Sequence, residues 1–339
     1  MISVTVIGSG AIGKFYGGLF SLAGSYVCYL EQSDFSIVQD QKYYEIELPS
    51  GSVKQVKPHQ IEKDYKLLPK ADIIIIALKT TENHLLKKFL PPTLKPNSKL
   101  LILQNGIGNE EYLSTFINTQ TIICGVTTIG AIRVKPGYVK ITHLGELNLA
   151  PFKSHDFSSC EYIKQQLATV NLSNGLFPQI HLFENHRIIR WSKLLWNTPF
   201  SSLSLLLNVS VDVIATQKKY QDIARAIMYE VCLAAKKDGA LIENKIEKLI
   251  AVTATLKGYY PSMYYDFKIS RPIESQYIIF NVLDYAQLHQ INLPVLSVIH
   301  KQLKSLEKTK EWLNKEEKNK LISILKLLID DKSKSIDAN

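Results

Sequence analysis

The sequence contains few cysteines and no long apolar run. Its four cysteines are far apart and form no CxxC pair or other metal-ligand spacing, at positions Cys28, Cys124, Cys160 and Cys232. We therefore predict no metal site, and we expect these residues to be small buried side chains in a reducing compartment. The longest apolar run, IIIIAL, is far shorter than the roughly 20 residues that span a bilayer. The amino-terminal stretch also has no basic leader, so we expect a soluble, cytoplasmic protein without a membrane partner.

Basic residues are in excess, but they are not gathered into a binding stripe. The 40 lysines and arginines exceed the 31 acidic residues and give a net charge of +9, which would suit an anionic partner. Much of the excess is lysine after residue 300, interleaved with Glu and Asp, as on a solvated helix face. A nucleic-acid surface would gather arginine and aromatic side chains together. We therefore predict no nucleic-acid partner and keep a small acidic metabolite as the candidate.

The two halves of the chain differ in the periodicity of their apolar residues. At 339 residues the chain is too long for one ordinary domain. The first half has short, nearly continuous apolar runs at 3–8, 26–31, 72–78, 100–104 and 121–125. Such runs are typical of parallel strands covered on both faces, and the stretches between them have room for crossover helices. This half therefore predicts a doubly wound α/β sheet.

After about residue 185 the apolar residues recur with the 3.6-residue period of helices. The clearest predicted helices lie in 185–197, 220–240 and 273–290. Pro199 predicts a kink or a fresh helix start with Thr198 as its N-cap. An apolar stripe near the carboxyl end is expected to pack on the body or on a second subunit, and it consists of Leu321, Ile324, Leu325 and Leu328.

The first predicted strand leads directly into three spaced glycines. VIGSGAIGKFYGG places Gly8, Gly10 and Gly13 in a GxGxxG spacing that precedes a helical run. Gly8 permits a tight turn, Gly10 lets the backbone approach a pyrophosphate, and Gly13 lets helix and strand close together. The helix start, with Ala11 and Ile12, offers free N–H groups to the phosphates. This pattern predicts a Rossmann-type dinucleotide-binding domain.

The predicted architecture is therefore an amino-terminal Rossmann-type parallel sheet followed by an all-helical domain. We expect the dinucleotide-binding domain to span 1–180 and the helical substrate and catalytic domain to span 185–330. The last residues, 331–339, are expected to form a frayed tail.

Polar residues follow several of the predicted strands. In open α/β sheets, ligands bind outside the carboxyl ends of the strands. We call the residues that follow these strands the polar exits, and they are Glu31-Gln32, Lys79-Thr80-Thr81 and Asn105-Gly106. Glu31 comes about 20 residues after the glycines, where an acidic side chain commonly binds the ribose hydroxyls of NAD. An arginine there would instead accept the 2′-phosphate of NADP, so the choice between the two cofactors stays open.

RWSKLLWN, residues 190–197, places a lysine in an apolar helical segment. An ammonium such as that of Lys193 is costly to bury unless something pairs with it or uses it. Asn197 falls on the same helical face, and Ser201 continues that face if the helix runs straight. One interpretation is snorkelling, with the lysine stem on apolar surface and the amine in water. Beside a dinucleotide domain, the other interpretation is a proton donor to a substrate carbonyl.

Several further motifs occur in order along the chain: GSGAIG, LKTTEN, LQNGIGNEE, W-x-K-L-x-x-N and P-S-M-x-x-D-x-x-x-x-R-x-x-E. In this order they resemble those of the ketopantoate reductases (2-dehydropantoate 2-reductases), over roughly residues 1–305. The resemblance implies a Rossmann domain and a helical domain with the site in the cleft between them. It also implies reduction of 2-dehydropantoate to pantoate with NADPH, on the pantothenate route to coenzyme A.

The resemblance implies roles for particular residues. Lys193 is similar to the family's catalytic lysine, and Glu274 to the glutamate that binds the substrate's hydroxyl. The remaining correspondences are Asn197 and Ser262 with substrate-binding residues, and Lys79 and Asn105 with residues near the nicotinamide and the cleft. The candidate cofactor-binding residues are Gly8, Gly10, Ala11, Ile12, Gly13, Glu31, Gln32, Lys79 and Asn105.

Some positions depart from the family pattern. Ser201 stands where a second substrate-contacting asparagine is usual, and Val211 stands where a further asparagine is usual. Gln32, preceded by Glu31, replaces an arginine that receives the phosphate of NADP in many members. A carboxy-terminal extension follows residue 305. The identity of the 2-oxo acid, the oligomeric state and the role of the extension stay open.

The main hypothesis is an NAD(P)H-dependent oxidoreductase that reduces 2-dehydropantoate, with Lys193 as general acid. The resemblance implies NADP(H) as the cofactor, and Glu31 and Gln32 leave NAD(H) open. The alternatives are reduction of another 2-oxo acid and a dinucleotide-binding sensor without turnover. The expected partner is a small anionic 2-oxo acid, and the chain is expected to be a monomer or a homodimer.

Overall fold

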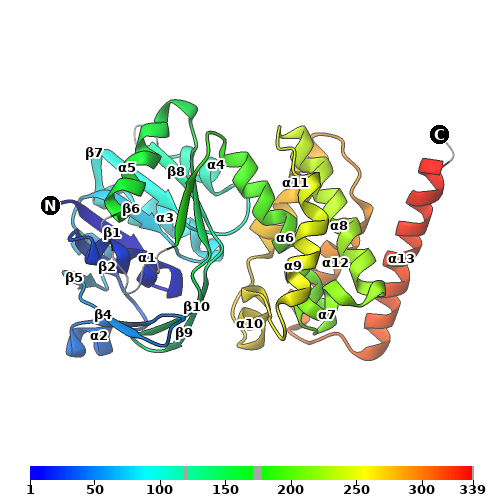
Figure 1. Ribbon diagram of the computed structural model, residues 1–339, viewed down its shortest axis with the longest axis horizontal. Helices are drawn as coiled ribbons and strands as arrows, with labels where there is room; N and C mark the ends of the chain where they lie inside the picture. The colour runs from blue at the N-terminus through cyan, green and yellow to red at the C-terminus, as the bar shows by residue number, and fades with distance from the viewer. Residues whose placement is uncertain (118–120, 169, 171–177, 338–339) are drawn as a thin grey trace. The chain divides into compact units, whose positions relative to one another are not determined.

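The computed structural model describes residues 1–117, 121–168, 170 and 178–337. The chain divides into two compact units (Figure 1). The first unit contains Met1–Asn105 and Asn109–Ile189, and the second contains Gly106–Gly108 and Arg190–Asn339. The chain leaves the first unit for the last time between Ile189 and Arg190, which lie inside one helix, α6 (His186–Leu207).

The first unit is built on a sheet that has eight strands in the described residues. The strand order is β12-β11-β8-β7-β6-β1-β2-β5, and neighbours are parallel except for β8 and β11. The strands are β1 (Ser3–Ile7), β2 (Tyr26–Leu30), β5 (Gln60–Glu62), β6 (Ala71–Ile76), β7 (Leu94–Ile102), β8 (Thr121–Thr127), β11 (Glu146–Pro151) and β12 (Gln179–Leu182). The predicted doubly wound α/β sheet is confirmed.

Both faces of this sheet are buried. Along β6, the side chains of Ile73 and Ile75 join one hydrophobic core, and those of Ile74 and Ile76 join the other. The covering helices are α1 (Ala11–Leu22) and α5 (Phe157–Ala168) on the first face, and α3 (Leu86–Phe89) and α4 (Asn109–Ser114) on the second (Figure 1). Because both faces are covered, the strand sequence has no polar alternation.

A second sheet in the same unit was not predicted from the sequence. In the described residues its order is β4-β3-β10-β9, with β3 (Tyr44–Glu47), β4 (Val53–Val56), β9 (Gly130–Lys135) and β10 (Tyr138–His143). Its central pair joins segments far apart in the sequence, such as Glu45 with Tyr138. The sheet packs on α1, where Ile46 and Val56 lie against Gly18. It thereby brings side chains of β3 and β9 to the dinucleotide-binding half of the unit.

The second unit is mostly helical in its described residues, as the sequence predicted. After α6, its helices are α7 (Val211–Thr216), α8 (Lys218–Lys237), α9 (Ile246–Thr255), α10 (Ser262–Lys268), α11 (Asn281–Leu288), α12 (Pro294–Thr309) and α13 (Lys315–Asp337). A five-residue π-helix, η7 (Gln276–Phe280), leads directly into α11.

Helix α6 is held by its aromatic residues. The indole N–H of Trp191 donates to Asp238 at 2.8 Å, and that of Trp196 donates to Thr253 at 2.9 Å. The predicted fresh helix start at Pro199 is wrong, because α6 continues through this residue to Leu207. Thr198 does not cap a new helix: its hydroxyl donates to the carbonyl oxygen of Ile278 at 3.0 Å. Tertiary packing of this buried segment overrides the local preference of proline.

The carboxy-terminal helix packs on the second unit itself. Helix α13 lies against α8 and α12 and buries Leu321 and Leu325. Its apolar stripe was expected to pack on the body of the chain or on a second subunit, and packing on the body is confirmed. The helix continues to Asp337, within the segment that we expected to be a tail.

All four cysteines are described, and each is buried and free of a disulfide. Within the described ranges, we find no helix whose length and apolarity would let it cross a bilayer.

The turn between β1 and α1 requires glycine at two of its three positions. Gly8 has φ +100°, and a β-carbon there would lie 2.1 Å from the backbone nitrogen of Leu78. A β-carbon on Gly13 would lie 2.1 Å from the carbonyl oxygen of Gly8. Gly10 is different, because no atom lies within 4 Å of the place that its β-carbon would take. The turn and the close packing therefore fix Gly8 and Gly13, while the space over Gly10 is open.

We expect Gly8→Ala to lower the free energy of unfolding by about 3 kcal/mol, because it combines a left-handed φ with a backbone clash. Gly10→Ala is the matched control, with φ −72° and open space around its β-carbon. It is expected to change the free energy of unfolding by no more than about 0.5 kcal/mol. Denaturant unfolding of both variants measures the difference, and equal losses would contradict this account of the turn.

Candidate active site

The start of α1 is built to receive an anionic group. Gly10 is the N-cap residue and supplies no side chain to cap the first N–H groups of the helix. Those donors and the positive end of the helix dipole favour a phosphate. Ala11 and Ile12 form the first helical residues and are only partly buried. Because the space over Gly10 is open as well, the turn fits the pyrophosphate of a dinucleotide.

The polar strand exits lie along one edge of the sheet. Strands β7, β6, β1 and β2 are consecutive neighbours and run parallel, so their carboxyl ends share an edge. Asn105, Lys79 and Glu31 follow β7, β6 and β2 in turn. The chain winds outward from β1 in both directions, which makes this edge the switch point where open α/β sheets bind ligands.

A chain of amide side chains holds two of these exits together, and the sequence did not reveal it. Gln104 donates to the carbonyl oxygen of Leu78 at 2.9 Å and to the side-chain oxygen of Asn83 at 2.7 Å. Asn83 donates to Asn109 at 3.0 Å, and Asn109 donates to the carbonyl oxygen of Asn105 at 3.0 Å. The backbone beside Lys79 and at Asn105 is therefore fixed by buried hydrogen bonds. Asparagine in both LKTTEN and LQNGIGNEE was the available signal.

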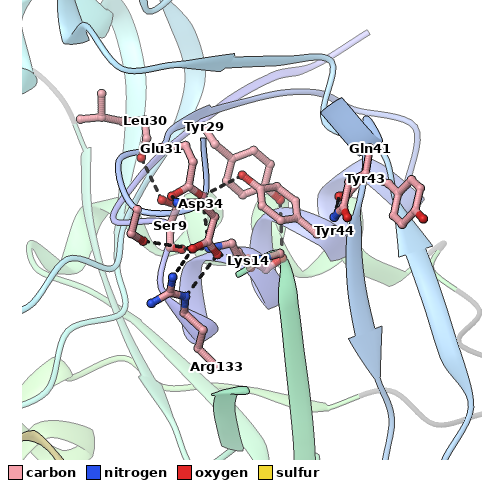
Figure 2. A network of polar contacts seen from close by, with 12 residues as sticks. Ser9, Lys14, Tyr29, Leu30, Glu31, Asp34, Gln41, Tyr43, Tyr44 and Arg133 are labelled. Atoms are coloured by element: carbon pink, nitrogen blue, oxygen red, sulfur yellow. Dashed lines mark hydrogen bonds and ion pairs between the residues drawn. The ribbon is translucent and has the colours of Figure 1, made fainter. Parts of the chain in front are cut away.

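Glu31 lies inside the protein rather than at the surface of this edge (Figure 2). Its carboxylate is 1% exposed and accepts hydrogen bonds from the Tyr44 hydroxyl at 2.9 Å and the Asp34 N–H at 3.1 Å. The Lys14 ammonium lies 3.1 Å away. The next residue, Gln32, is exposed, and its amide donates to the carbonyl oxygen of Lys63 at 2.8 Å. A direct bond from Glu31 to a ribose hydroxyl would need its carboxylate to turn outward.

Asp34, just before α2 (Phe35–Gln41), is the most heavily bonded carboxylate of this region (Figure 2). Lys14 lies 2.7 Å from it, the Gly137 N–H donates at 2.9 Å, and the guanidinium of Arg133 donates through two nitrogens. Burial alone would raise the pKa of Asp34, but the bonds from Lys14, Arg133 and Gly137 outweigh it and hold the pKa at about 2. Sequence reasoning missed Lys14, although it stands in an apolar helix as Lys193 does.

Helix α6 carries the predicted substrate-facing residues of the second unit. Lys193, Asn197 and Ser201 follow at intervals of four within one continuous helix, so they share a face. Asn197 and Ser201 are buried, and Lys193 is partly buried. The Lys193 ammonium lies 5.7 Å from the centre of the Trp196 ring. Desolvation lowers the pKa of Lys193 to about 8, which brings it into the range of a general acid.

Two further predicted residues, Glu274 and Ser262, belong to the same unit. Glu274 is buried just before η7, whereas Ser262 is exposed at the start of α10. The Ile107 N–H donates to the carbonyl oxygen of Tyr277 at 2.9 Å, and Asn281 bonds back to the Ile107 carbonyl. The loop Gly106–Gly108 thus packs on η7, and π-helical turns occur frequently at functional sites.

The fold and these residues define a two-unit, dinucleotide-dependent oxidoreductase. Comparison with known families places it more narrowly. The model described as "Ketopantoate reductase PanE/ApbA" matches residues 4–154, and the one described as "Ketopantoate reductase PanE/ApbA C terminal" matches residues 185–307. The chain belongs to the ketopantoate reductase family and is an NAD(P)-dependent oxidoreductase.

Individual relatives support this placement. A 2-dehydropantoate 2-reductase of Nostoc sp. (strain PCC 7120) is 33% identical over 89% of this chain and 94% of its own length. The crystal structure of 2-dehydropantoate 2-reductase from Methylococcus capsulatus superimposes with a TM-score of 0.81 at 26% identity, covering 92% of this chain and 99% of that one. D-mandelate dehydrogenase, solved with NADH and anilino(oxo)acetate, shares the fold at 19% identity, with a TM-score of 0.79 and coverage of 91% and 99%.

We expect substitutions of the two lysines, Lys14 and Lys193, to have different effects on stability. Lys14→Met leaves two buried carboxylates with a single cation, and we expect it to lower the free energy of unfolding by about 3–5 kcal/mol. Lys193→Met is the matched change at an ammonium that no carboxylate pairs with in the described residues, and its lowered pKa shows that burial disfavours the charge. We expect this variant to be as stable as the wild type or more stable. Thermal unfolding at neutral pH measures both, and a larger loss for Lys193→Met would contradict the assignment.

Proposed function

We propose that this oxidoreductase reduces 2-dehydropantoate to pantoate, with Lys193 as the general acid. The observation that carries the proposal is the lowered pKa of Lys193, about 8, on the helix face that also holds Asn197 and Ser201. The 33% identical Nostoc relative, a 2-dehydropantoate 2-reductase, supports the same substrate. Membership of the ketopantoate reductase family supports the same class of reaction.

The chain's own residues supply binding and the proton. The N–H groups at the start of α1 hold the pyrophosphate, and the edge at Lys79 and Asn105 holds the nicotinamide end of the cofactor. The reduced nicotinamide supplies a hydride. As negative charge develops on the substrate's carbonyl oxygen, the Lys193 ammonium stabilises it and donates a proton. Glu274 binds the substrate's hydroxyl group.

The polar side chains on α6 complete the substrate site in this proposal. Asn197 and Ser201 bind the polar groups of the substrate, and Ser262 contributes from the start of α10. A cationic residue at the centre of the site also suits the carboxylate of a 2-oxo acid. Nothing in this scheme calls for a metal ion, and the described residues contain no cluster of three or more metal-ligating side chains.

Another 2-oxo acid is the second candidate substrate. Ser201 is shorter than the asparagine that the family resemblance leads us to expect, and it offers fewer hydrogen bonds. D-mandelate dehydrogenase, which was solved with an oxoacetate, shares the fold. A wider or less polar site would accept a 2-oxo acid with a different side chain.

We expect the purified protein to oxidise NADH or NADPH when 2-dehydropantoate is added, as followed by the loss of absorbance of the reduced nicotinamide. A panel of 2-oxo acids that differ in branching and hydroxylation is the comparison, and 2-dehydropantoate should give the highest kcat/KM. A higher value for another member would favour the second candidate. Cofactor binding without turnover of any member would leave a dinucleotide-binding sensor.

The pH dependence tests the role of Lys193. A general acid must be protonated, and a lysine is protonated below its pKa, so kcat/KM should fall as the pH rises above about 8. Lys193→Met should lose the ~10²-fold or more that a general acid contributes, with cofactor affinity largely kept. Turnover that is unchanged in this variant would return Lys193 to a snorkelling role.

A further inference from the structure

Four charged side chains gather where β2 ends beside the glycine turn (Figure 2). We call them the Lys14 cluster, and they are Lys14, Glu31, Asp34 and Arg133. Two cations face two carboxylates, so the cluster carries no net charge. Lys14 comes from α1, Arg133 comes from β9 of the second sheet, and the carboxylates come from the segment after β2. This is the segment that lies beside the adenosine ribose in dinucleotide-binding sheets of this kind.

The cations of the cluster are committed to protein groups. The side chain of Lys14 is fully buried, and its ammonium contacts Glu31, Asp34 and the carbonyl oxygen of Ser9 in the glycine turn. Arg133 is 26% exposed, yet its Nε and one terminal nitrogen both donate to Asp34. The Ser9 hydroxyl donates to the Leu30 carbonyl oxygen at 3.0 Å and ties the turn to β2. Lys14 cannot bind a phosphate without giving up a buried carboxylate, and the charge of Arg133 is already balanced by Asp34.

NAD(H) and NADP(H) differ in the charge at the 2′ position of the adenosine ribose, so the charges of the protein beside this position favour one cofactor over the other. A phosphate monoester carries about −1.5 to −2 charges at pH 7 and is bound best by a free arginine fork. Gln32, the residue after Glu31, is exposed and uncharged, and the carboxylates of Glu31 and Asp34 are buried against the cations of the cluster. A 2′-phosphate would therefore meet no uncompensated cation of the Lys14 cluster. The 2′-hydroxyl of NAD(H) is uncharged and has no such requirement.

We infer that the Lys14 cluster makes this enzyme prefer NAD(H) to NADP(H), with Glu31 as a specificity-determining residue that acts by neutralising Lys14. The inference rests on the proposed function only in that the glycine turn binds a nicotinamide dinucleotide. It departs from the NADP(H) that the family resemblance implies. It also gives Glu31 a role in cofactor choice that needs no direct bond to the ribose.

The test is direct binding of NADH and of NADPH, followed by the fluorescence of the reduced nicotinamide without any substrate. We expect the wild type to bind NADH at least ~10-fold more tightly than NADPH, because the charge of the 2′-phosphate would be left unbalanced. A tenfold difference in the dissociation constant corresponds to about 1.4 kcal/mol. Glu31→Gln keeps the shape but leaves Lys14 partly unneutralised, so it should shift the ratio of the two dissociation constants toward NADPH by ~10-fold.

Asp72→Asn is the matched control. It removes one carboxylate from an ion pair with Lys95, 2.7 Å apart, and Asp72 lies near the amino ends of β1 and β6, at the opposite edge of the same sheet. The same change of charge there should leave the ratio unchanged. Gln32→Arg alters an exposed position and adds a cation at the proposed place, so it should also shift the ratio toward NADPH even if Glu31→Gln folds poorly.

The outcomes separate the two proposals. Equal or tighter binding of NADPH by the wild type would overturn the inference and leave the proposed reductase function standing. A shift in Glu31→Gln no larger than that in Asp72→Asn, with none in Gln32→Arg, would overturn the role of the cluster. Binding of neither dinucleotide would overturn the proposed function and this inference with it, whereas the expected ratios would support both.

Discussion

The cost of burying a lysine ammonium shapes both units of this protein. An ammonium loses its hydration on burial, so it must be paired with anions or accept a lowered pKa. The first unit pairs Lys14 with Glu31 and Asp34, and all three side chains are buried. The second unit gives Lys193 an indole face and a pKa of about 8. The same residue type thus serves as a structural cation in one unit and is suited to proton transfer in the other.

The cofactor edge of the sheet is braced by a buried polar network at each end. At the β2 end, the Lys14 cluster joins the glycine turn to the second sheet. At the β6 and β7 end, Gln104, Asn83 and Asn109 fix the backbone of the two other exits. Hydrogen-bonded polar networks in a low-dielectric interior resist rearrangement, because breaking one bond leaves an unsatisfied group. The edge is therefore preorganised for its ligand by groups that do not themselves need to touch it.

Membership of the family establishes the class of chemistry more firmly than the choice of ligands. The resemblance to the family rests on the glycine turn and the lysine helix, and the similar crystal structure from Methylococcus capsulatus shares the fold. The departures fall at Ser201 and Gln32, which face the substrate and the ribose in our proposals. A fold can keep its reaction while such positions alter what is bound, since function depends on the site rather than on the scaffold. Substrate and cofactor therefore require separate measurements.

Local periodicity and motif spacing were enough to predict several features from the sequence. These are the parallel sheet, the glycine turn, the helical second half and the candidate lysine helix. The sequence could not reveal the second sheet, whose strands pair distant segments, or the continuity of α6 through Pro199, which tertiary packing maintains. It also predicted Glu31 as a candidate ribose-binding residue without showing that Lys14 holds its carboxylate inside. Only the tertiary structure decided this, because the partners of a buried charge come from separate elements that meet only in the folded chain.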